Sequence, residues 1–189
     1  KVLAETHPQI AEAIKGALAR EKIGASGKIE ILFGEAARPL PFREFKLVNV
    51  RRVGTKLIRT EIATDVPLKG WTHYADLLLF ATIAAGNEVE ATRYWNAAME
   101  LWDGKGFLDE AARAHQRYAT YKLGLALHAG ARMLPAPKTL ETIKAKLLSL
   151  QSDSGGWITD YDEQGDRLGV ANVETTCLAI LGLERSGRN

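Results

Sequence analysis

The sequence predicts a mainly α-helical fold, an α/α toroid or a part of one, that carries a β-rich insertion at about residues 28–65. Two observations predict this fold. From Thr72 onward, apolar residues recur at the spacing of helical faces in one segment after another. Before Thr72, the apolar residues change to the period that is typical of strands. We expect the 189 residues to form one domain of this kind or part of one.

The segment before Thr72 is expected to form one helix and a β-hairpin. Residues 8–22 repeat apolar side chains on one helical face, with a proline near the start. From residue 28 onward, β-branched and aromatic residues alternate or run together, and Gly54 and Thr55 separate the last two runs. A β-hairpin between roughly residues 43 and 62 is the simplest interpretation.

Five further helices are predicted after Thr72, and each ends at a glycine, before a proline or at an acidic turn. They cover residues 73–86, 88–104, 117–134, 138–151 and 172–187. The first, third and fifth are apolar nearly all round, which indicates helices enclosed on every side, whereas the second and fourth are amphipathic. Enclosed and amphipathic helices therefore alternate, as in a toroid whose helical hairpins form an inner and an outer ring.

One motif stands at the junction of the last two predicted helices, on residues Lys144, Leu147, Leu148, Gln151, Gly155, Gly156 and Trp157. It resembles the QW repeat of the terpenoid cyclase and protein prenyltransferase superfamily. The resemblance implies that Gln151 caps a helix end and that Trp157 stacks close to it, which would tie neighbouring hairpins together. The helix that starts near Val173 would then be the next inner helix.

Shorter phrases resemble recurrent phrases of uncharacterised archaeal proteins of this toroid type, namely "TEIATD", "YADLL", "LWDG", "TYKL" and "NVETT". A full ring needs more helices than the six that the sequence predicts. The chain is therefore expected to be half of a longer protein, a partial ring, or a protomer that completes its ring with a partner. Because it begins at Lys1 and not at Met, its compartment stays open.

The candidate site lies where the enclosed helices begin. In a toroid these ends converge on a central funnel, and their free N–H groups favour anionic or polar ligands. We predict Asp76 and Glu174 as a catalytic carboxylate pair, with Tyr121 or Lys122 as the alternative base. The predicted substrate-binding residues are Trp71, Tyr74, Tyr118, Trp157, Asn172 and Thr175, with either tryptophan as a stacking platform for a sugar ring.

A purely structural interpretation explains several of these residues equally well. Asn172 and Thr175 are residue types that cap a helix, and Asp76 occupies a first turn where the helix dipole favours it. Among the other carboxylates, Asp103 and Asp109 are second choices because they are expected at the opposite end of a helix. Two acids that are expected after the hairpin could fold over the mouth of the funnel, and they are Glu61 and Asp65.

The mixture of hydroxyls, carboxyls, an amine and aromatic rings at the helix starts suits a sugar better than a hydrocarbon. The predicted activity is therefore attack on a glycosidic bond, by a hydrolase or a lyase. A non-catalytic module that binds a glycan, a lipid tail or a protein partner is the alternative. A cyclase-like enzyme is a third, but its Asp-X-Asp-Asp acid is only approximated at residues 160–163, and 7% of the residues are aromatic.

The acidic segment at residues 160–166 has two interpretations. Asp160, Asp162 and Gly165 fit three places of a calcium loop, but Ala171 stands where the bidentate glutamate belongs. A surface β-hairpin that turns at "DEQGD" explains the same letters without a metal, and we favour it.

Several other classes of function are disfavoured. One cysteine, Cys177, rules out an internal disulfide, and the four histidines show no ligand spacing, so no metal is expected. No cofactor is expected, because the glycine-rich nucleotide-binding motifs do not occur. A formal net charge of +2 gives no case for nucleic acid, and no apolar run approaches the roughly 20 residues that span a bilayer.

Overall fold

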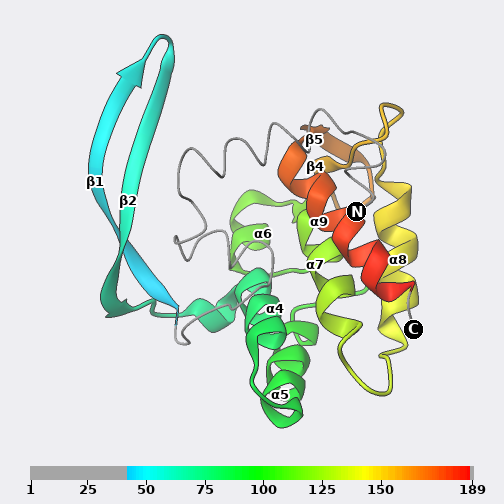
Figure 1. Cartoon of the computed structure of the whole chain (residues 1–189). Coiled ribbons are helices and arrows are strands. Elements are labelled where there is room, and N and C mark those ends of the chain that lie inside the picture. The colour runs from blue at the N-terminus through cyan, green and yellow to red at the C-terminus, as the bar shows by residue number, and fades with distance from the viewer. Residues whose placement is uncertain (1–41, 188–189) are drawn as a thin grey trace. The chain divides into compact units, whose positions relative to one another are not determined.

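Six α-helices, one short 3-10 helix, a two-stranded sheet and a three-stranded sheet make up the part of the chain that the computed structural model describes, residues 42–187 (Figure 1). These residues belong to one compact unit, which spans residues 39–189. The prediction of a mainly α-helical fold with a β-hairpin insertion is confirmed for them. The predicted helix at 8–22 and the predicted strand at 28–33 lie outside the described residues.

The elements follow one another along the chain with short connections. They are β1 (Arg43–Val53), β2 (Lys56–Pro67), the short 3-10 helix η2 (Trp71–His73), α4 (Ala75–Ala84), α5 (Glu88–Met99), α6 (Glu110–His115), β3 (Tyr118–Ala119), α7 (Tyr121–Gly130), α8 (Thr139–Ser149), β4 (Ile158–Tyr161), β5 (Arg167–Ala171) and α9 (Val173–Ser186).

The hairpin predicted between residues 43 and 62 is present as the antiparallel pair β1–β2. Gly54 adopts a φ of 61° in its turn, a left-handed conformation that glycine adopts without steric cost. β2 continues to Pro67, so Glu61 and Asp65 lie within a strand. The prediction that these two acids follow the hairpin is wrong, because the β-branched residues after position 62 extend the ladder.

The five helices predicted after Thr72 are all present, each with shorter bounds, and α6 is an additional helix that the sequence analysis missed. α6 has only six residues, which is too few to show an apolar period. Its start is nevertheless marked by Asp109, whose carboxylate accepts a hydrogen bond from the Ala112 N–H. Gln116 ends it with a φ of 54°.

Tyr118 does not begin a helix, so that part of the prediction is wrong. Tyr118 and Ala119 form β3, which pairs antiparallel with β4 opposite Tyr161 and Asp160. α7 therefore starts only at Tyr121. The pairing partner lies some forty residues further along the chain, and local periodicity cannot report such a contact.

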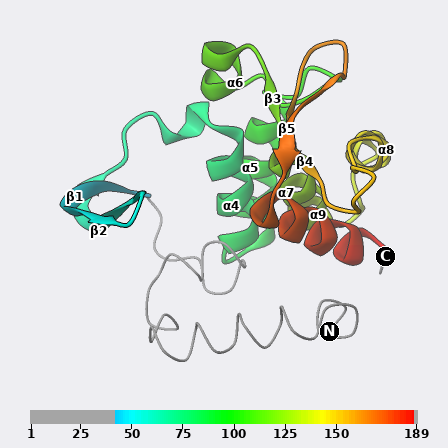
Figure 2. The same cartoon turned by 90° about the horizontal axis from the view of Figure 1, so that it is seen from above.

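α7 is the central helix of the described residues. It packs between α4 and α9, while α5 covers α4 and α8 covers α7 (Figures 1 and 2). α4 and α7 bury most of their residues, in agreement with the prediction of enclosed helices. For α9 that prediction is wrong, because it buries only one stripe, formed by Thr175, Leu178, Ala179 and Gly182.

Two glycines let α7 and α9 approach closely. A Cβ atom on Gly124 would lie 2.6 Å from the carbonyl oxygen of Leu178, and one on Gly182 would collide with the carbonyl of Gly124. Both obstacles are backbone atoms, which cannot move aside as a side chain can. The contact between these helices therefore requires glycine at both positions.

The QW-like motif joins α8 to α9 through Trp157. Its indole N–H donates to the carbonyl of Leu147 in the last turn of α8 (2.8 Å), and its backbone N–H donates to the Thr176 hydroxyl of α9 (3.0 Å). The predicted cap by Gln151 is wrong, because its side chain donates to the Gly155 carbonyl within the loop (2.9 Å). The tryptophan satisfies the helix-end carbonyl instead.

The acidic segment forms the predicted surface turn, between β4 and β5. The Asp162 carboxylate accepts hydrogen bonds from the N–H groups of Gln164 (3.0 Å) and Asp166 (2.8 Å), and Gly165 adopts a φ of 90°. In the described residues, no three His, Cys, Asp or Glu side chains gather as metal ligands would. The hairpin interpretation is thus the one that the structure supports.

Replacement of Gly182 by alanine should destabilise the protein. Although alanine favours a helix over glycine by about 1 kcal/mol, the added methyl group must push α9 away from α7. We expect a net loss of about 1–3 kcal/mol in the free energy of unfolding, measured by urea denaturation. Gly86→Ala is the matched control, because open space surrounds Gly86. Equal stability of the two variants would contradict the close approach of the helices.

His128 of α7 should make stability depend on pH. It is buried and its Nδ1 has no hydrogen-bond partner among the described residues. Burial, with the charges of Arg185 and Arg132, lowers the pKa of His128 to about 4. The pKa of histidine in the unfolded chain is about 6.5, so between about pH 4 and pH 6.5 the unfolded state binds more protons at this position than the folded state does. The contribution of His128 to the free energy of unfolding is therefore fully present above about pH 6.5 and is lost as the pH falls toward 4.

Urea denaturation between pH 7 and pH 4 measures this effect. His128→Leu should flatten the fall in the free energy of unfolding, whereas His115→Leu, at an exposed position, should leave it in place. The same slope in the wild type and in His128→Leu would show that other groups cause the acid sensitivity.

Candidate functional site

The starts of α4 and α7 meet at a hydrogen bond between two predicted site residues. The Tyr121 hydroxyl donates to Asp76 Oδ2 at 2.8 Å. Asp76 lies in the first turn of α4, and Tyr121 is the first residue of α7. Glu174, in the first turn of α9, acts on the same phenol through its charge. The structure therefore brings Asp76 and Tyr121 together, and Glu174 lies near enough for its charge to raise the pKa of Tyr121.

Tyr121 is held in its protonated form. Burial raises its pKa most, and the negative charge of Asp76 and the hydrogen bond to it raise it further. The charges of Asp109 and Glu174 act in the same direction. A phenol that resists ionisation this strongly can donate a hydrogen bond but is poorly suited to act as a general base.

Asp76 has one oxygen that is not engaged. Oδ2 accepts from Tyr121, whereas Oδ1 is buried and has no hydrogen-bond partner within residues 42–187. The position in the first turn of α4 favours a negative charge, because the helix dipole is positive there. Asp76 is therefore an oriented carboxylate with a free acceptor atom.

Lys122 forms a buried ion pair with Asp109. Its Nζ lies 2.5 Å from Asp109 Oδ2, and the side chains are only 3% and 0% exposed. Asp109 also accepts from the N–H of Ala75 (2.9 Å) and from that of Ala112 (3.0 Å). The prediction that Asp109 lies at the opposite end of a helix is wrong, because its carboxylate sits against the start of α4. This pairing favours a structural role for Lys122 over that of a base.

Trp71 and Tyr74 stand just before α4 and contact other aromatic or charged groups. The Trp71 ring packs edge-on against Phe42 (5.2 Å between centroids) and tilted against Tyr94 (5.8 Å). Tyr74 occupies the N-cap position of α4. The charge of Glu110 in α6 is the main reason why its pKa is raised.

Three further predicted binding residues have local structural roles. The Asn172 side chain accepts from the Thr175 N–H at 2.8 Å and so caps α9, as the structural interpretation expected. Thr175 is 2% exposed and Trp157 is 5% exposed. The buried indole therefore offers no face on which a sugar ring could stack.

Tyr118 belongs to a compact aromatic group. Its ring stacks on Tyr161 (5.2 Å between centroids), and its hydroxyl donates to Asp103. Asp103 follows the carboxyl end of α5, in agreement with its predicted place at the end of a helix. Gly106 makes room for the stack, because a Cβ there would lie 2.5 Å from Cγ of Tyr118.

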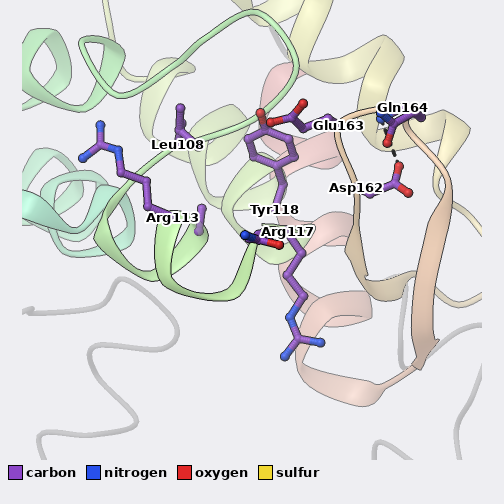
Figure 3. Close-up of a pocket in the computed structure, with 9 residues that line it drawn as sticks. Leu108, Arg113, Arg117, Tyr118, Asp162, Glu163 and Gln164 are labelled. Carbon is purple, nitrogen blue, oxygen red and sulfur yellow. Dashed lines mark hydrogen bonds between the residues drawn. The ribbon is translucent and has the colours of Figure 1, made fainter.

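A pocket with a volume of about 380 Å³ opens beside Tyr118 (Figure 3). α6 and its flanking residues form one wall, and the turn between β4 and β5 forms the other. We call it the α6–turn pocket, and its lining residues are Leu108, Ala112, Arg113, Gln116, Arg117, Tyr118, Asp162, Glu163 and Gln164. Of these, the sequence analysis singled out only Tyr118 and, as part of the acidic segment, residues 162–164.

The sequence did not indicate that Asp109 is the buried partner of Lys122 and of the N–H groups of Ala75 and Ala112, or that Arg113 lines a pocket. A signal for Asp109 was available, because an aspartate directly before Glu110 and two alanines is typical of a helix start. No local signal marks Arg113, since an arginine on a short helix usually faces solvent.

Comparison with known proteins gives no further guidance, because no family model, no curated protein and no solved structure matches this chain. Within the described residues, no helix is long and apolar enough to cross a membrane.

Removal of the ammonium group in Lys122→Met should cost about 3–5 kcal/mol in the free energy of unfolding, because Asp109 would stay buried without its counter-ion. The double variant Lys122→Met/Asp109→Asn should recover most of this loss, since no charge is then buried and asparagine still caps α6. Urea denaturation measures both, with Lys138→Met at an exposed position as the control. A single variant as stable as this control would contradict the ion pair.

Proposed function

We propose that this chain is a carbohydrate-binding domain of the partial α/α-toroid type, with its ligand site at the amino-terminal ends of α4 and α7. The pairing of helices supports the toroid part of the proposal. α4 packs with α5 and α7 with α8, and the first helices of these pairs are neighbours, as in successive hairpins of a ring. α9 packs beside α7, as the first helix of a next hairpin would.

The unpaired oxygen of the Asp76 carboxylate is the observation that supports a sugar as the ligand. Tyr121 fixes the carboxylate through one oxygen, and the other oxygen has no partner among the described residues. A hydroxyl group is a suitable donor to such an acceptor. Because Oδ1 is buried, a ligand reaches it only if the starts of α4 and α7 separate. Sugars carry many hydroxyls and no charge that Asp76 or the nearby Glu174 would repel.

Hydrolysis of a glycosidic bond is the second candidate function. It needs two carboxyl groups, one as acid and one as base or nucleophile. Asp76 contacts Tyr121 and Glu174 acts on the same phenol, which supports these two as the pair. Lyase chemistry is less well supported, because Tyr121 is held protonated and Lys122 is held in its ion pair.

The third candidate function, a cyclase-like enzyme, is poorly supported, because the two aspartates that would supply its catalytic acid are engaged elsewhere. Asp160 lies 3.7 Å from Arg117 Nε, and Asp162 is occupied by the backbone of its own turn. Each carboxylate is thus engaged by a group other than a second carboxyl, whereas the acid of a cyclase needs a neighbouring carboxyl to share its proton. We therefore do not propose cyclase chemistry.

Calorimetric titration of the whole chain with a panel of neutral oligosaccharides tests the binding proposal. For a ligand that binds, Asp76→Asn should weaken the affinity about tenfold, because a hydrogen bond to a charged group contributes about 1.5–3 kcal/mol. Asp153→Asn, at an exposed position outside the site, should leave the affinity unchanged. Failure of every oligosaccharide to bind, or equal affinities of the two variants, would contradict the proposal.

The same panel separates binding from hydrolysis. An increase in reducing ends that Glu174→Gln abolishes, while the affinity stays within a factor of about two, would identify the paired-carboxylate enzyme. Binding without an increase in reducing ends would identify a non-catalytic module.

A further inference from the structure

The α6–turn pocket is lined by charged residues of both signs, which belong to its two walls. Arg113 belongs to α6, and Figure 3 shows its guanidinium directed away from Tyr118. Glu163 lies on the turn between β4 and β5, with its carboxylate beside the Tyr118 hydroxyl. None of the lining residues belongs to the Asp76–Tyr121 pair, so this pocket is a different place in the fold.

Two of the four charged side chains that line the pocket are already engaged. Arg117 Nε lies 3.7 Å from the carboxylate of Asp160. Asp162 accepts two hydrogen bonds from the backbone of its own turn, and these bonds set the shape of that wall. Arg117 and Asp162 therefore have partners without a ligand.

The other two charges are free to meet a ligand. The side chains of Arg113 and Glu163 are exposed, and neither side chain forms an ion pair or a hydrogen bond with another described residue. They do not neutralise each other, because they stand on opposite walls of the pocket. The pocket thus holds one unpaired cation and one unpaired anion.

The uncharged residues of the lining include both polar and apolar side chains. The side-chain amides of Gln116 and Gln164 make no hydrogen bond within residues 42–187 and can both donate and accept. Leu108 and Ala112 add a small apolar area. A ligand with polar ends and a short apolar body matches this distribution.

We propose that the α6–turn pocket binds a small zwitterion, a molecule with one carboxylate and one ammonium group, such as an amino acid or a short peptide. The carboxylate pairs with the Arg113 guanidinium, whose planar fork matches two carboxylate oxygens. The ammonium pairs with Glu163. A simple anion would be repelled by Glu163 and a simple cation by Arg113, so a ligand with both charges is favoured over either.

Chemical-shift perturbation in nuclear magnetic resonance spectra of the whole chain tests this inference. The probes are glycine, 4-aminobutanoate, diglycine and triglycine, which place the two charges at increasing separations. Butanoate and butylamine are the single-charge controls. At least one zwitterion should shift the signals of residues 112–118 and 162–164 in a saturable way, with an affinity at least tenfold above that of both controls.

Variants of the two free charges identify the contacts. Arg113→Gln and Glu163→Gln should each weaken the binding of that zwitterion about tenfold, and both positions are exposed, so the fold should be unaffected. Glu141→Gln, at an exposed position of α8 outside the pocket, is the matched control. The double exchange Arg113→Glu/Glu163→Arg should restore affinity relative to the single charge reversals, because the ligand can bind in the opposite direction.

The outcomes separate this inference from the proposed function. Asp76→Asn should leave zwitterion binding unchanged, and Arg113→Gln should leave oligosaccharide binding unchanged. No saturable shift with any zwitterion would overturn the inference, as would equal affinity for butanoate or butylamine. Loss of binding in Asp76→Asn but not in Arg113→Gln would also overturn it, since the ligand would then occupy the helix starts.

Discussion

The buried ion pair between Lys122 and Asp109 is the interaction on which the arrangement of the described helices depends. Burial of two charges is costly, so each must keep its partners. Asp109 satisfies this requirement with the ammonium and with the N–H groups of Ala75 and Ala112, which belong to α4 and α6. One carboxylate therefore fixes the starts of two helices against α7. The contact between Asp76 and Tyr121, each one residue away from a member of this network, follows from it.

A second constraint positions the turn that carries Glu163. The stack of Tyr118 on Tyr161 joins β3 to β4, and the Tyr161 hydroxyl donates to the carbonyl of Lys105 in the loop before α6 (2.9 Å). Asp109 thus fixes the start of α6, and the tyrosines connect the segments on either side of α6 to the β4–β5 hairpin, so the two walls of the α6–turn pocket are held in place. Arg113 and Glu163 therefore belong to separate walls, and no ion pair between them closes the pocket.

Much of the fold could be predicted because it follows from local rules. Five helices, the first hairpin and the acidic turn were predicted from periodicity and turn residues, and the cap by Asn172 was among the expected alternatives. The errors occurred where a distant partner decides the outcome. Tyr118 is a strand residue because it pairs with Tyr161, and Gln151 leaves the end of α8 to Trp157, which reaches both neighbouring helices.

For this protein, the sequence by itself determined the five longer helices, the first hairpin and the acidic turn, since apolar period, turn glycines and caps act over a few residues. Only the tertiary structure decided what each charge does. Asp109 and Glu163 are both ordinary acids in the sequence, yet one is buried in an ion pair and the other is exposed beside a pocket. The physical reason is that desolvation and pairing depend on residues that are remote in the chain, which no local pattern records.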